Sequence, residues 1–300
     1  MSENISHIEG LLLIDKPSGP TSHDSVNVVR RVSGIRRVGH TGTLDPLASG
    51  LMIICLGRAT RLAEYVSSLP KSYRAAVRLG QETDSYDSEG AVVWEREVNF
   101  TPEELNEALS SFRGDIVQKP PLFSAKKING VPLYKLARKG QQVPIPERLV
   151  TVYDLELISW EQPDIELLIS CSAGTYIRSI AHDLGSILNC GGHITALRRT
   201  SIGDFYVDES VSLSDLSQDN WMSHLQPSET AVRHLPRLAL SEQESLSLFN
   251  GQVVEYQSNQ PRDQLVKAYD PHGQFVGIVV LEDQFWRAKK IFYGSVVNTS

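Results

Sequence analysis

A twelve-residue loop that leads directly into a buried strand is the most constraining feature of this chain. Residues 39–50 contain three glycines, one proline, one histidine and a single carboxylate, and the apolar run at residues 51–56 predicts a strand. Glycine and proline fix an unusual backbone path, and the residue before a proline is kept out of the helical region. That residue is Asp45, so the loop predicts one acid held at a set angle at a sheet edge. The local sequence is equally typical of an ordinary Asp-Pro surface turn.

Strands that follow one another without an intervening helix predict an α+β protein with a mixed, largely antiparallel sheet flanked by helices. Residues 10–15 form a short apolar run that predicts a buried strand. Residues 73–79 alternate between apolar and polar side chains, which predicts a half-buried strand with a basic outer face. Residues 165–171 form a third apolar strand.

Helix start and stop signals lie between these strands. Thr21 precedes apolar residues at helical spacing, and Gly34 supplies a stop. A helix is expected from residue 57 to about residue 67. Residues 101–104, Thr-Pro-Glu-Glu, form a capping box with proline at the first helical position, and apolar residues then repeat through residue 112.

A further helix is expected after the turn at residues 172–174. Thr175 is predicted to cap it, and the glycines near residue 191 are predicted to end it. Within this helix Arg178 and His182 are four residues apart, so they are expected on the same side.

The sequence changes in character near residue 235. The following segment predicts one short helix and several short strands, with Asp-Pro-His-Gly at residues 270–273 as a type I turn between two of them. The expected helix is 241–250, and the expected strands are 253–256, 265–269, 274–281 and 286–290. This pattern predicts a small β-barrel-like module at residues 236–300, separate from a larger domain at residues 1–235.

Bulk properties narrow the class of protein. The net charge is −7, which taken alone argues mildly against a nucleic-acid partner, but the charge is segregated: residues 118–148 hold seven Lys or Arg and one acid. The same segment is rich in proline, which favours a long excursion from the sheet. The three cysteines have no metal-ligand spacing and predict buried free thiols in a reducing cytoplasm. No apolar run approaches the length of a membrane span.

Five segments together resemble one known family. The loop at residues 39–50 closely resembles the catalytic loop of the TruB-type tRNA pseudouridine synthases, and four other motifs of that family follow its order along the chain. These motifs are Ile14-Asp15-Lys16-Pro17, Lys71-Ser72-Tyr73-Arg74, Gly174-Thr175-Tyr176-Ile177-Arg178 and Ala196-Leu197-Arg198-Arg199. The resemblance runs from about residue 10 to residue 202. It implies the pseudouridine-synthase fold, and the position of the C-terminal module resembles that of a PUA-type RNA-binding domain.

The resemblance implies an isomerase that flips uridine 55 out of the tRNA T-loop, breaks its glycosidic bond and rejoins the base through C5. It assigns Asp45 as the nucleophile, Arg178 as the cation that lowers the pKa of that acid, and Tyr73 as the shelf for the base and an aid in moving the C5 proton. The implied substrate-binding residues are His40, Lys16, Pro17, Tyr176 and Leu197. Of these, His40 would fill the gap that the base leaves, and Leu197 would touch the flipped base.

The resemblance also implies the partners. The basic insertion, residues 118–148, corresponds to a segment that closes over the T-arm of tRNA, so Lys126, Lys127 and Lys135 are candidates for contacts with the RNA backbone. No pattern suggests a metal, a nucleotide cofactor or a phosphate-binding glycine loop, so a cofactor-free reaction is expected. A monomer without a protein partner, in the cytoplasm and away from membranes, is the corresponding expectation.

Two other functions fit parts of the sequence. A non-catalytic RNA-binding or RNA-folding protein could use the same fold, although it would have no need for Asp45, Tyr73 and Arg178 together. A glycosidase-like hydrolase would need a second carboxylate, for which Asp84 and Asp87 are candidates in a polar loop without features of a site.

Overall fold

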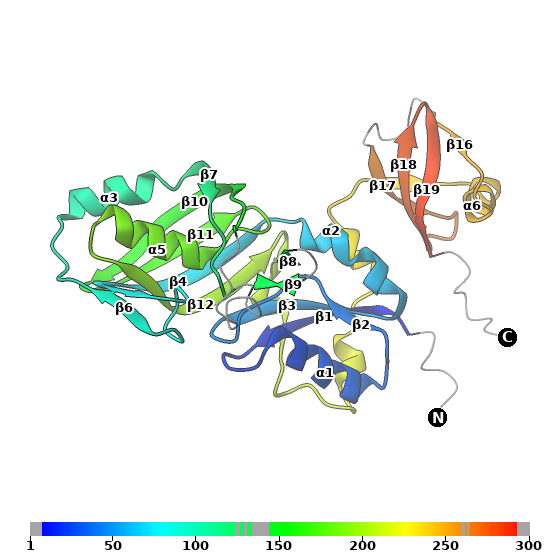
Figure 1. Cartoon of the computed structure of the whole chain (residues 1–300). Helices are drawn as coiled ribbons and strands as arrows, with labels where there is room; N and C mark the ends of the chain where they lie inside the picture. The colour runs from blue at the N-terminus through cyan, green and yellow to red at the C-terminus, as the bar shows by residue number, and fades with distance from the viewer. Residues whose placement is uncertain are drawn as a thin grey trace.

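The computed structural model describes residues 8–123, 127–128, 131–133, 144–257, 259, 262 and 264–292. Two separate sheets organise this part of the chain, and Figure 1 shows the smaller one, with β17, β18 and β19, at the upper right. The larger sheet has ten strands in the order β14-β1-β3-β12-β4-β11-β10-β7, with β2 paired to β3 and β13 paired to β12. Its strands are β1 (Gly10–Lys16), β2 (Val38–His40), β3 (Ser49–Leu56), β4 (Lys71–Leu79), β7 (Gly114–Gln118), β10 (Arg148–Glu161), β11 (Asp164–Cys171), β12 (Gly192–Ile202), β13 (Phe205–Tyr206) and β14 (Val211–Ser212).

The predicted fold class is confirmed by the pairing of these strands. Only the β1–β14 and β12–β3 pairs are parallel within the described ten-stranded sheet, and its other pairs are antiparallel. The three predicted strands at residues 10–15, 73–79 and 165–171 correspond to β1, β4 and β11. Strand β4 alternates between buried and exposed residues, as predicted for a strand with one face in the core.

Two capped helices confirm the start signals in the sequence. Helix α1 (Ser22–Ser33) begins at the Thr21 capping box and ends at Gly34, which adopts the left-handed conformation with φ of 70°. Helix α3 (Pro102–Ser110) begins at the Thr101 capping box. The helix expected over residues 57–67 is wrong in its first half, because η2 (Gly57–Leu62) is a 3₁₀ helix and only α2 (Ala63–Ser67) is α-helical.

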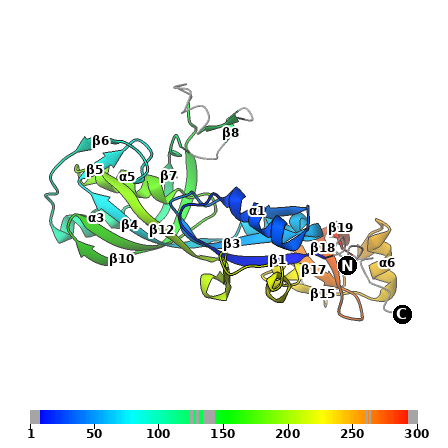
Figure 2. The same ribbon diagram turned by 90° about the horizontal axis from the view of Figure 1, so that it is seen from below.

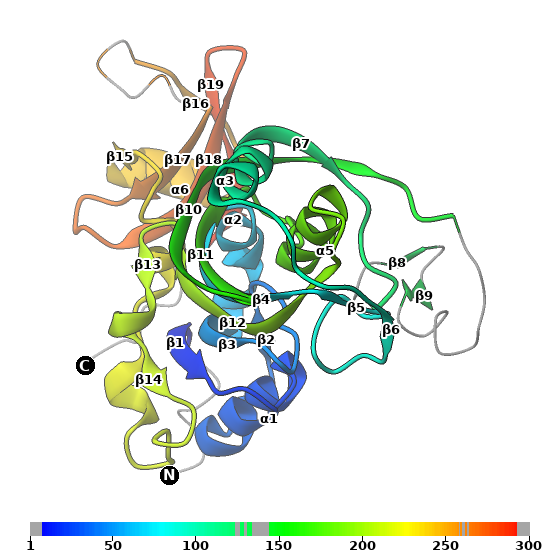
Figure 3. The same cartoon turned by 90° about the vertical axis from the view of Figure 1, so that its left-hand side faces the viewer.

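Helix α5 (Ile177–Ile187) lies in the hollow of the curved strands β4, β10, β11 and β12, as Figure 3 shows. Its apolar stripe, with Ile180 and Leu184, is buried against these strands, which makes the main core beneath the site. The predicted cap by Thr175 is wrong. The Thr175 hydroxyl donates back to the carbonyl of Ser172 at 3.0 Å, and Tyr176 takes the cap position without a side-chain hydrogen bond.

The predicted basic outer face of β4 is neutralised in the folded chain. Arg78 lies 2.8 Å from Asp164, and Arg74 forms an ion pair with Glu166, both across the neighbouring strand β11. These two arginines are therefore not free cations for a phosphate partner.

The remaining described elements are short. Strands β5 (Gln81–Thr83) and β6 (Val92–Glu95) form a two-stranded ribbon, as do β8 (Lys127–Ile128) and β9 (Val131–Pro132). In Figure 2, β8 stands away from the ten-stranded sheet. The 3₁₀ helices η3 (Val207–Glu209), η4 (Trp221–His224) and η5 (Ser228–Val232) lead toward the second sheet. The candidates Lys126 and Lys135 lie outside the described residues, and Lys127 is described only as the first residue of β8.

The predicted small β module is confirmed as a curled five-stranded sheet in the order β15-β17-β18-β19-β16. The elements are β15 (Arg237–Ala239), α6 (Glu242–Phe249), β16 (Val254–Glu255), β17 (Leu265–Tyr269), β18 (Phe275–Glu282) and β19 (Phe285–Ile291). Strand β15 was not predicted, because three residues carry too short a pattern. The turn at residues 270–273 is confirmed by the hydrogen bond from the Gly273 N–H to the Asp270 carbonyl at 3.0 Å.

Two further sequence predictions are tested directly. All three cysteines are buried free thiols, and burial raises the pKa of Cys55 to about 12. Among the helices in the described part of the chain, none is long and apolar enough to cross a membrane.

Candidate active site

The fold brings the predicted chemical groups into one cavity. Asp45 from the loop before β3, Tyr73 from β4, Arg178 from α5 and Leu197 from β12 all line a cavity of about 330 Å³, together with Tyr176. This volume is in the range of sites for small organic groups. These residues are far apart in the sequence, so the sheet and α5 create the site by assembling them.

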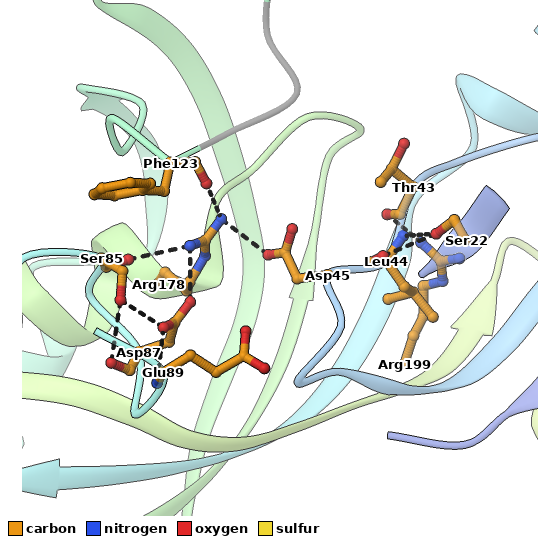
Figure 4. Close-up of polar contacts among 10 residues, drawn as sticks. All are labelled: Ser22, Thr43, Leu44, Asp45, Ser85, Asp87, Glu89, Phe123, Arg178 and Arg199. Carbon is orange, nitrogen blue, oxygen red and sulfur yellow. Dashed lines mark hydrogen bonds and ion pairs between the residues drawn. The ribbon is translucent and has the colours of Figure 1, made fainter. Parts of the chain in front are cut away.

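Arg178 is the centre of the polar network, and Figure 4 shows its contacts. One terminal nitrogen, Nη2, lies 2.9 Å from Oδ2 of Asp45, and the other, Nη1, lies 2.8 Å from Oδ2 of Asp87. The guanidinium also donates to the backbone carbonyls of Ser85 and Phe123, at 3.1 and 2.8 Å. The Arg178 side chain is only 6% exposed, so these four acceptors hold the cation in a fixed orientation.

Asp87 was a candidate only as a second carboxylate of a hydrolase, and its contact with Arg178 was not predicted from the sequence. The polar loop between β5 and β6 gave no sign of a site, but the Asp87 side chain is only 4% exposed and contacts the same cation as Asp45. The other candidate in this loop, Asp84, is exposed and accepts the backbone N–H of Ala91 at 2.9 Å, which is a turn contact. The available signal was an acidic loop with serines next to its acids. This pattern is too common in surface loops to indicate a buried partner of Arg178.

Arg178 acts to lower the pKa of Asp45, as expected, but the net pKa is raised above its ordinary value. Removal of the carboxylate from water is the largest cause, and the nearby negative charge of Asp87 acts in the same direction. Arg178 and then Lys16 oppose these effects without overcoming them, because the loss of hydration is the largest effect. The Asp45 side chain remains 36% exposed, so it is open to a ligand in the cavity.

The loop that carries Asp45 is fixed from below by Arg199, which is 2% exposed. Arg199 donates from Nε to the carbonyl of Leu51 at 2.7 Å and from Nη2 to that of Gly42 at 3.3 Å. At Gly50, with φ of 100°, a side chain would place its Cβ 2.3 Å from the Arg199 carbonyl oxygen. Only glycine fits this position, which explains one of the three glycines in the loop.

A second clamp acts directly beside Asp45. The Ser22 hydroxyl, at the start of α1, donates to the carbonyl of Leu44 and accepts its N–H, both at 2.8 Å. Because Leu44 is the residue before Asp45, this pair of bonds sets where the carboxylate emerges. The loop that the sequence predicted to be fixed is therefore held by two side chains, Ser22 and Arg199, to which the sequence assigned no role.

Tyr73 lies deep in the cavity and is 9% exposed. Burial raises the pKa of its hydroxyl, and a hydrogen bond from Arg199 opposes that rise. The phenol therefore stays protonated at neutral pH and offers a ring face and a hydroxyl to a ligand. Lys71, two residues earlier, also lines the cavity and donates to the carbonyls of Ser67 and Leu69, both at 2.5 Å. Burial lowers the pKa of Lys71 to about 8.

Lys16 and Pro17 do not line the described cavity, contrary to expectation. Lys16 is fully buried, and its ammonium donates to the carbonyls of Pro17 and Pro20 at 2.8 and 2.7 Å, with that of Pro46 at 3.5 Å. It therefore supports the loop from behind, next to Asp45. Burial lowers the pKa of Lys16 to about 8, and Asp45 opposes this effect. Pro17 is exposed and outside the cavity.

His40 lies at the end of β2 beside a second cavity of about 730 Å³, on the other side of Asp45. Asp45 and Arg178 line both cavities, so the carboxylate sits where the two spaces meet. Burial lowers the pKa of His40, which favours the neutral imidazole. A neutral, flat ring next to the loop suits packing against an uncharged group.

The chain is similar to known proteins over nearly its whole length. Residues 30–177 match the family described as "TruB family pseudouridylate synthase (N terminal domain)", residues 178–237 match "tRNA pseudouridylate synthase B C-terminal domain", and residues 236–284 match "Pseudouridine synthase II TruB, C-terminal". The protein named tRNA pseudouridine synthase B from Caldanaerobacter subterraneus is 42% identical over 95% of this chain and 99% of its own length. Its namesake from Chromobacterium violaceum is 43% identical over 92% of this chain and 91% of its own length.

A solved structure supports the fold. One chain of an H/ACA ribonucleoprotein bound to a substrate RNA aligns with a TM-score of 0.72 and 24% identity, over 97% of this chain and 86% of that chain.

Proposed function

This chain belongs to the TruB family of pseudouridylate synthases, and from that premise we propose that it converts uridine 55 in the T-loop of tRNA to pseudouridine. The observation that carries the proposal is the shared cavity of Asp45, Tyr73, Arg178 and Leu197. Curated relatives with about 40% identity carry the name tRNA pseudouridine synthase B, which supports tRNA as the substrate.

The proposed reaction begins with eversion of the target base into the cavity. Flipping costs a few kcal/mol of lost stacking, about as much as a buried aromatic and apolar wall can return. Tyr73 and Leu197 are the proposed contacts of the base, and Tyr176 lines the same cavity. His40, beside the second cavity, is proposed to fill the place that the base has left.

Asp45 is the proposed nucleophile in the step that breaks the C–N glycosidic bond. Arg178 orients its carboxylate, and the Ser22 and Arg199 clamps hold the loop, so little reorganisation is needed when the bond breaks. The base then turns, forms the C–C bond through C5, loses the C5 proton and gains one at N1. Tyr73 is proposed to help move that proton. The atoms balance without a cofactor, because the product is an isomer of the substrate.

Contacts with the T-arm are proposed for the basic insertion at residues 118–148. Lys126, Lys127 and Lys135 would meet phosphates there, since RNA loops are recognised largely by shape, stacking and backbone contacts. We retain as proposals the division into a catalytic domain, residues 1–235, and an RNA-binding module, residues 236–300. Action as a monomer in the cytoplasm belongs to the same proposal.

The direct test is incubation of the purified protein with an unmodified tRNA transcript, followed by mapping of the modified nucleotide. We expect pseudouridine at position 55 and at no other uridine of that transcript. Modification elsewhere would reject the position, and no modification would reject the activity.

Asp45→Asn separates the enzyme from a non-catalytic RNA-binding protein. The variant should lose pseudouridine formation and keep nearly normal affinity for tRNA, whereas a pure binding function has no product to lose. A hydrolase would release free uracil, and we expect none. Asp87, the one buried candidate for a second carboxylate, is occupied by Arg178 and Ser85, which argues against a role as a free acid.

A further inference from the structure

The residue before Asp87 has an unusual backbone. Tyr86 adopts a φ of 64°, in the left-handed region that side chains other than glycine and asparagine rarely occupy. Such a conformation persists only where surrounding contacts hold it, and it is found most often next to functional groups. The loop must therefore contain contacts that compensate for the conformation of Tyr86.

Stacking on His182 is the contact that holds the Tyr86 side chain. The two ring centroids are 3.9 Å apart, and the ring planes differ by 25°. His182 lies on α5 four residues after Arg178, so the ring that supports the loop and the cation that the loop contacts belong to the same side of one helix. Arg178 and His182 were expected on the same side of the helix, and this placement lets both of them contact the loop.

The imidazole is itself fixed at both nitrogens. Nδ1 lies 2.9 Å from Oδ1 of Asp183, and Nε2 lies 3.2 Å from Oε1 of Glu82. Glu82 belongs to β5, directly before the loop. His182 thus joins α5 to the start of the loop through Glu82 and to its middle through Tyr86.

The two residues that flank Tyr86 are the ones that contact Arg178. The carbonyl of Ser85 accepts from Nη1 at 3.1 Å, and the Asp87 carboxylate lies 2.8 Å from the same nitrogen. The Ser85 hydroxyl also donates to Oδ1 of Asp87 at 2.5 Å. A rotation of the backbone at Tyr86 would therefore move both acceptors away from the guanidinium.

The far side of the loop is tied to the sheet. The Tyr86 carbonyl accepts the N–H of Ile194 at 3.1 Å, and the N–H of Ser88 donates to the carbonyl of Ile194 at 2.9 Å. The backbone of the loop is thus held by β12, and the ring of Tyr86 is held by His182 of α5. Without the ring contact, Tyr86 itself is held by backbone hydrogen bonds, from its N–H to the Thr83 carbonyl at 3.2 Å and to its carbonyl from the Ile194 N–H.

We propose that Tyr86 and His182 form a positioning pair, whose stack fixes the left-handed turn that presents Ser85 and Asp87 to Arg178 and so orients Asp45. The pair touches neither the cavity around Tyr73 nor the reacting atoms, and it acts through Asp87 and Arg178. The inference rests on the proposed function for its consequence, but the geometry that it describes is independent of activity.

Tyr86→Leu is the variant that tests the pair. It removes the stack and keeps a side chain in the unfavourable backbone region. We expect the single-turnover rate on tRNA to fall by about tenfold or more, because small displacements of catalytic groups have effects of this size. Affinity for tRNA should stay within about twofold, since no contact with RNA is removed. Tyr86→Phe retains the ring, so its rate should match that of the unchanged protein.

A double-mutant cycle separates positioning from general loss of structure. In an Asp87→Asn background, Tyr86→Leu should have little further effect on the rate, because both changes act on the same contact with Arg178. Multiplicative rate losses in the double variant would overturn the proposal. So would an unchanged rate for Tyr86→Leu, or a loss in Tyr86→Phe as large as that in Tyr86→Leu.

A crystal structure of Tyr86→Leu supplies the readout that does not depend on activity. We expect the contact between Asp87 and Arg178 to lengthen or break, with the φ of residue 86 changed. An intact contact would overturn the proposal even if the protein had no activity on tRNA. If the unchanged protein forms no pseudouridine but the variant loses the contact, then the proposed function fails and the positioning pair stands.

Discussion

Asp45 and Asp87 share a single guanidinium, one at each terminal nitrogen of Arg178, at 2.9 and 2.8 Å. Asp87 is nearly fully buried, whereas Asp45 faces the cavity. Loss of hydration is the largest reason that the pKa of Asp45 is raised, and the negative charge of Asp87 raises it further. The geometry therefore couples the orientation of the proposed nucleophile to its ionisation.

Asp87→Asn should move the acid limb of the rate profile. The negative charge of Asp87 raises the pKa of Asp45, so its removal lowers that pKa and keeps Asp45 ionised at lower pH. The maximal single-turnover rate should nevertheless fall by about tenfold to a hundredfold, because Arg178 loses a fixed partner. Single-turnover rates measured across the acidic range test both effects. An acid limb shifted to higher pH would contradict this account of the charge.

The same substitution should reduce stability. Removal of one partner from a buried ion pair costs about 3–5 kcal/mol, and we expect less here because asparagine still accepts a hydrogen bond and Arg178 keeps Asp45. Urea unfolding of Asp87→Asn measures the loss. Glu89→Gln is the matched control, since Glu89 is an exposed acid in the same loop and should change the free energy of unfolding by less than about 0.5 kcal/mol.

Asp45→Asn should stabilise the folded chain at neutral pH while abolishing activity. The pKa of Asp45 is raised in the folded state, so its ionisation disfavours folding at every pH above the ordinary value of 3.8. Asparagine removes that charge and leaves the Asp87–Arg178 contact in place. The gain in melting temperature should be largest near neutral pH and should disappear as the pH approaches 3.8. A variant that melts below the unchanged protein at neutral pH would contradict the raised pKa.

The sequence predicted the two chemical ends of the site but not the connection between them. Asp45 and Arg178 stood in motifs whose glycine, proline and helix signals are local, and local signals survive in a single sequence. Asp87 contacts Arg178 across 91 positions of the chain, and nothing in the loop itself indicates a buried partner. Its role follows only from the contacts that the loop after β5 makes with α5 in the folded chain.

Burial explains the other differences between expectation and structure. Lys16 was expected to face the substrate, but its long side chain turns inward because three backbone carbonyls need a donor there. Arg74 was predicted to be an unpaired cation on the outer face of its strand. Its partner Glu166 lies on another strand, so the local sequence gave no sign of the ion pair. Thr175 is a residue type that often caps helices, but here its hydroxyl donates to the Ser172 carbonyl in the preceding turn.

Lys16→Met should lower activity through the loop rather than through contact with RNA. Methionine keeps most of the buried volume and removes the donor to the carbonyls around Pro17 and Pro46. We expect a rate reduced by about tenfold or more with nearly unchanged affinity for tRNA. Lys289→Met, at an exposed lysine of β19, is the control and should leave both quantities unchanged.

The pH dependence of stability offers a second measurement on Lys16→Met. The pKa of Lys16 is about 8 in the folded state against an ordinary 10.5, so the unfolded chain binds more protons between these values. Stability from this group therefore rises with pH over that window, and the variant lacks the rise. The free energy of unfolding of the unchanged protein, minus that of the variant, should increase from about pH 8 to 10.5. If this difference stayed constant or decreased with pH, the conclusion that burial lowers the pKa of Lys16 would be rejected.

Neutralising the basic insertion should weaken tRNA binding and flatten its salt dependence. Lys126, Lys127 and Lys135 are proposed to meet phosphates, and each phosphate contact contributes about 0.7 to 0.9 to the slope of log affinity against log salt. The triple Lys→Gln variant should therefore reduce the magnitude of the slope by about 2, measured by equilibrium binding at several salt concentrations. Its rate at saturating tRNA should change little, because these lysines have no proposed part in the chemical step.

A control for net charge is available on β4. Arg74 and Glu166 form an ion pair, so the double variant Arg74→Gln and Glu166→Gln removes one charge of each sign and leaves the net charge unchanged. It should leave the salt slope unchanged, since a paired arginine releases no counterions when RNA binds. An unchanged slope in the triple lysine variant, or an equal loss of slope in the β4 variant, would remove the insertion from the binding surface. Phosphate contacts would then have to come from other cations of the chain, and the segregation of charge at residues 118–148 would have no bearing on RNA.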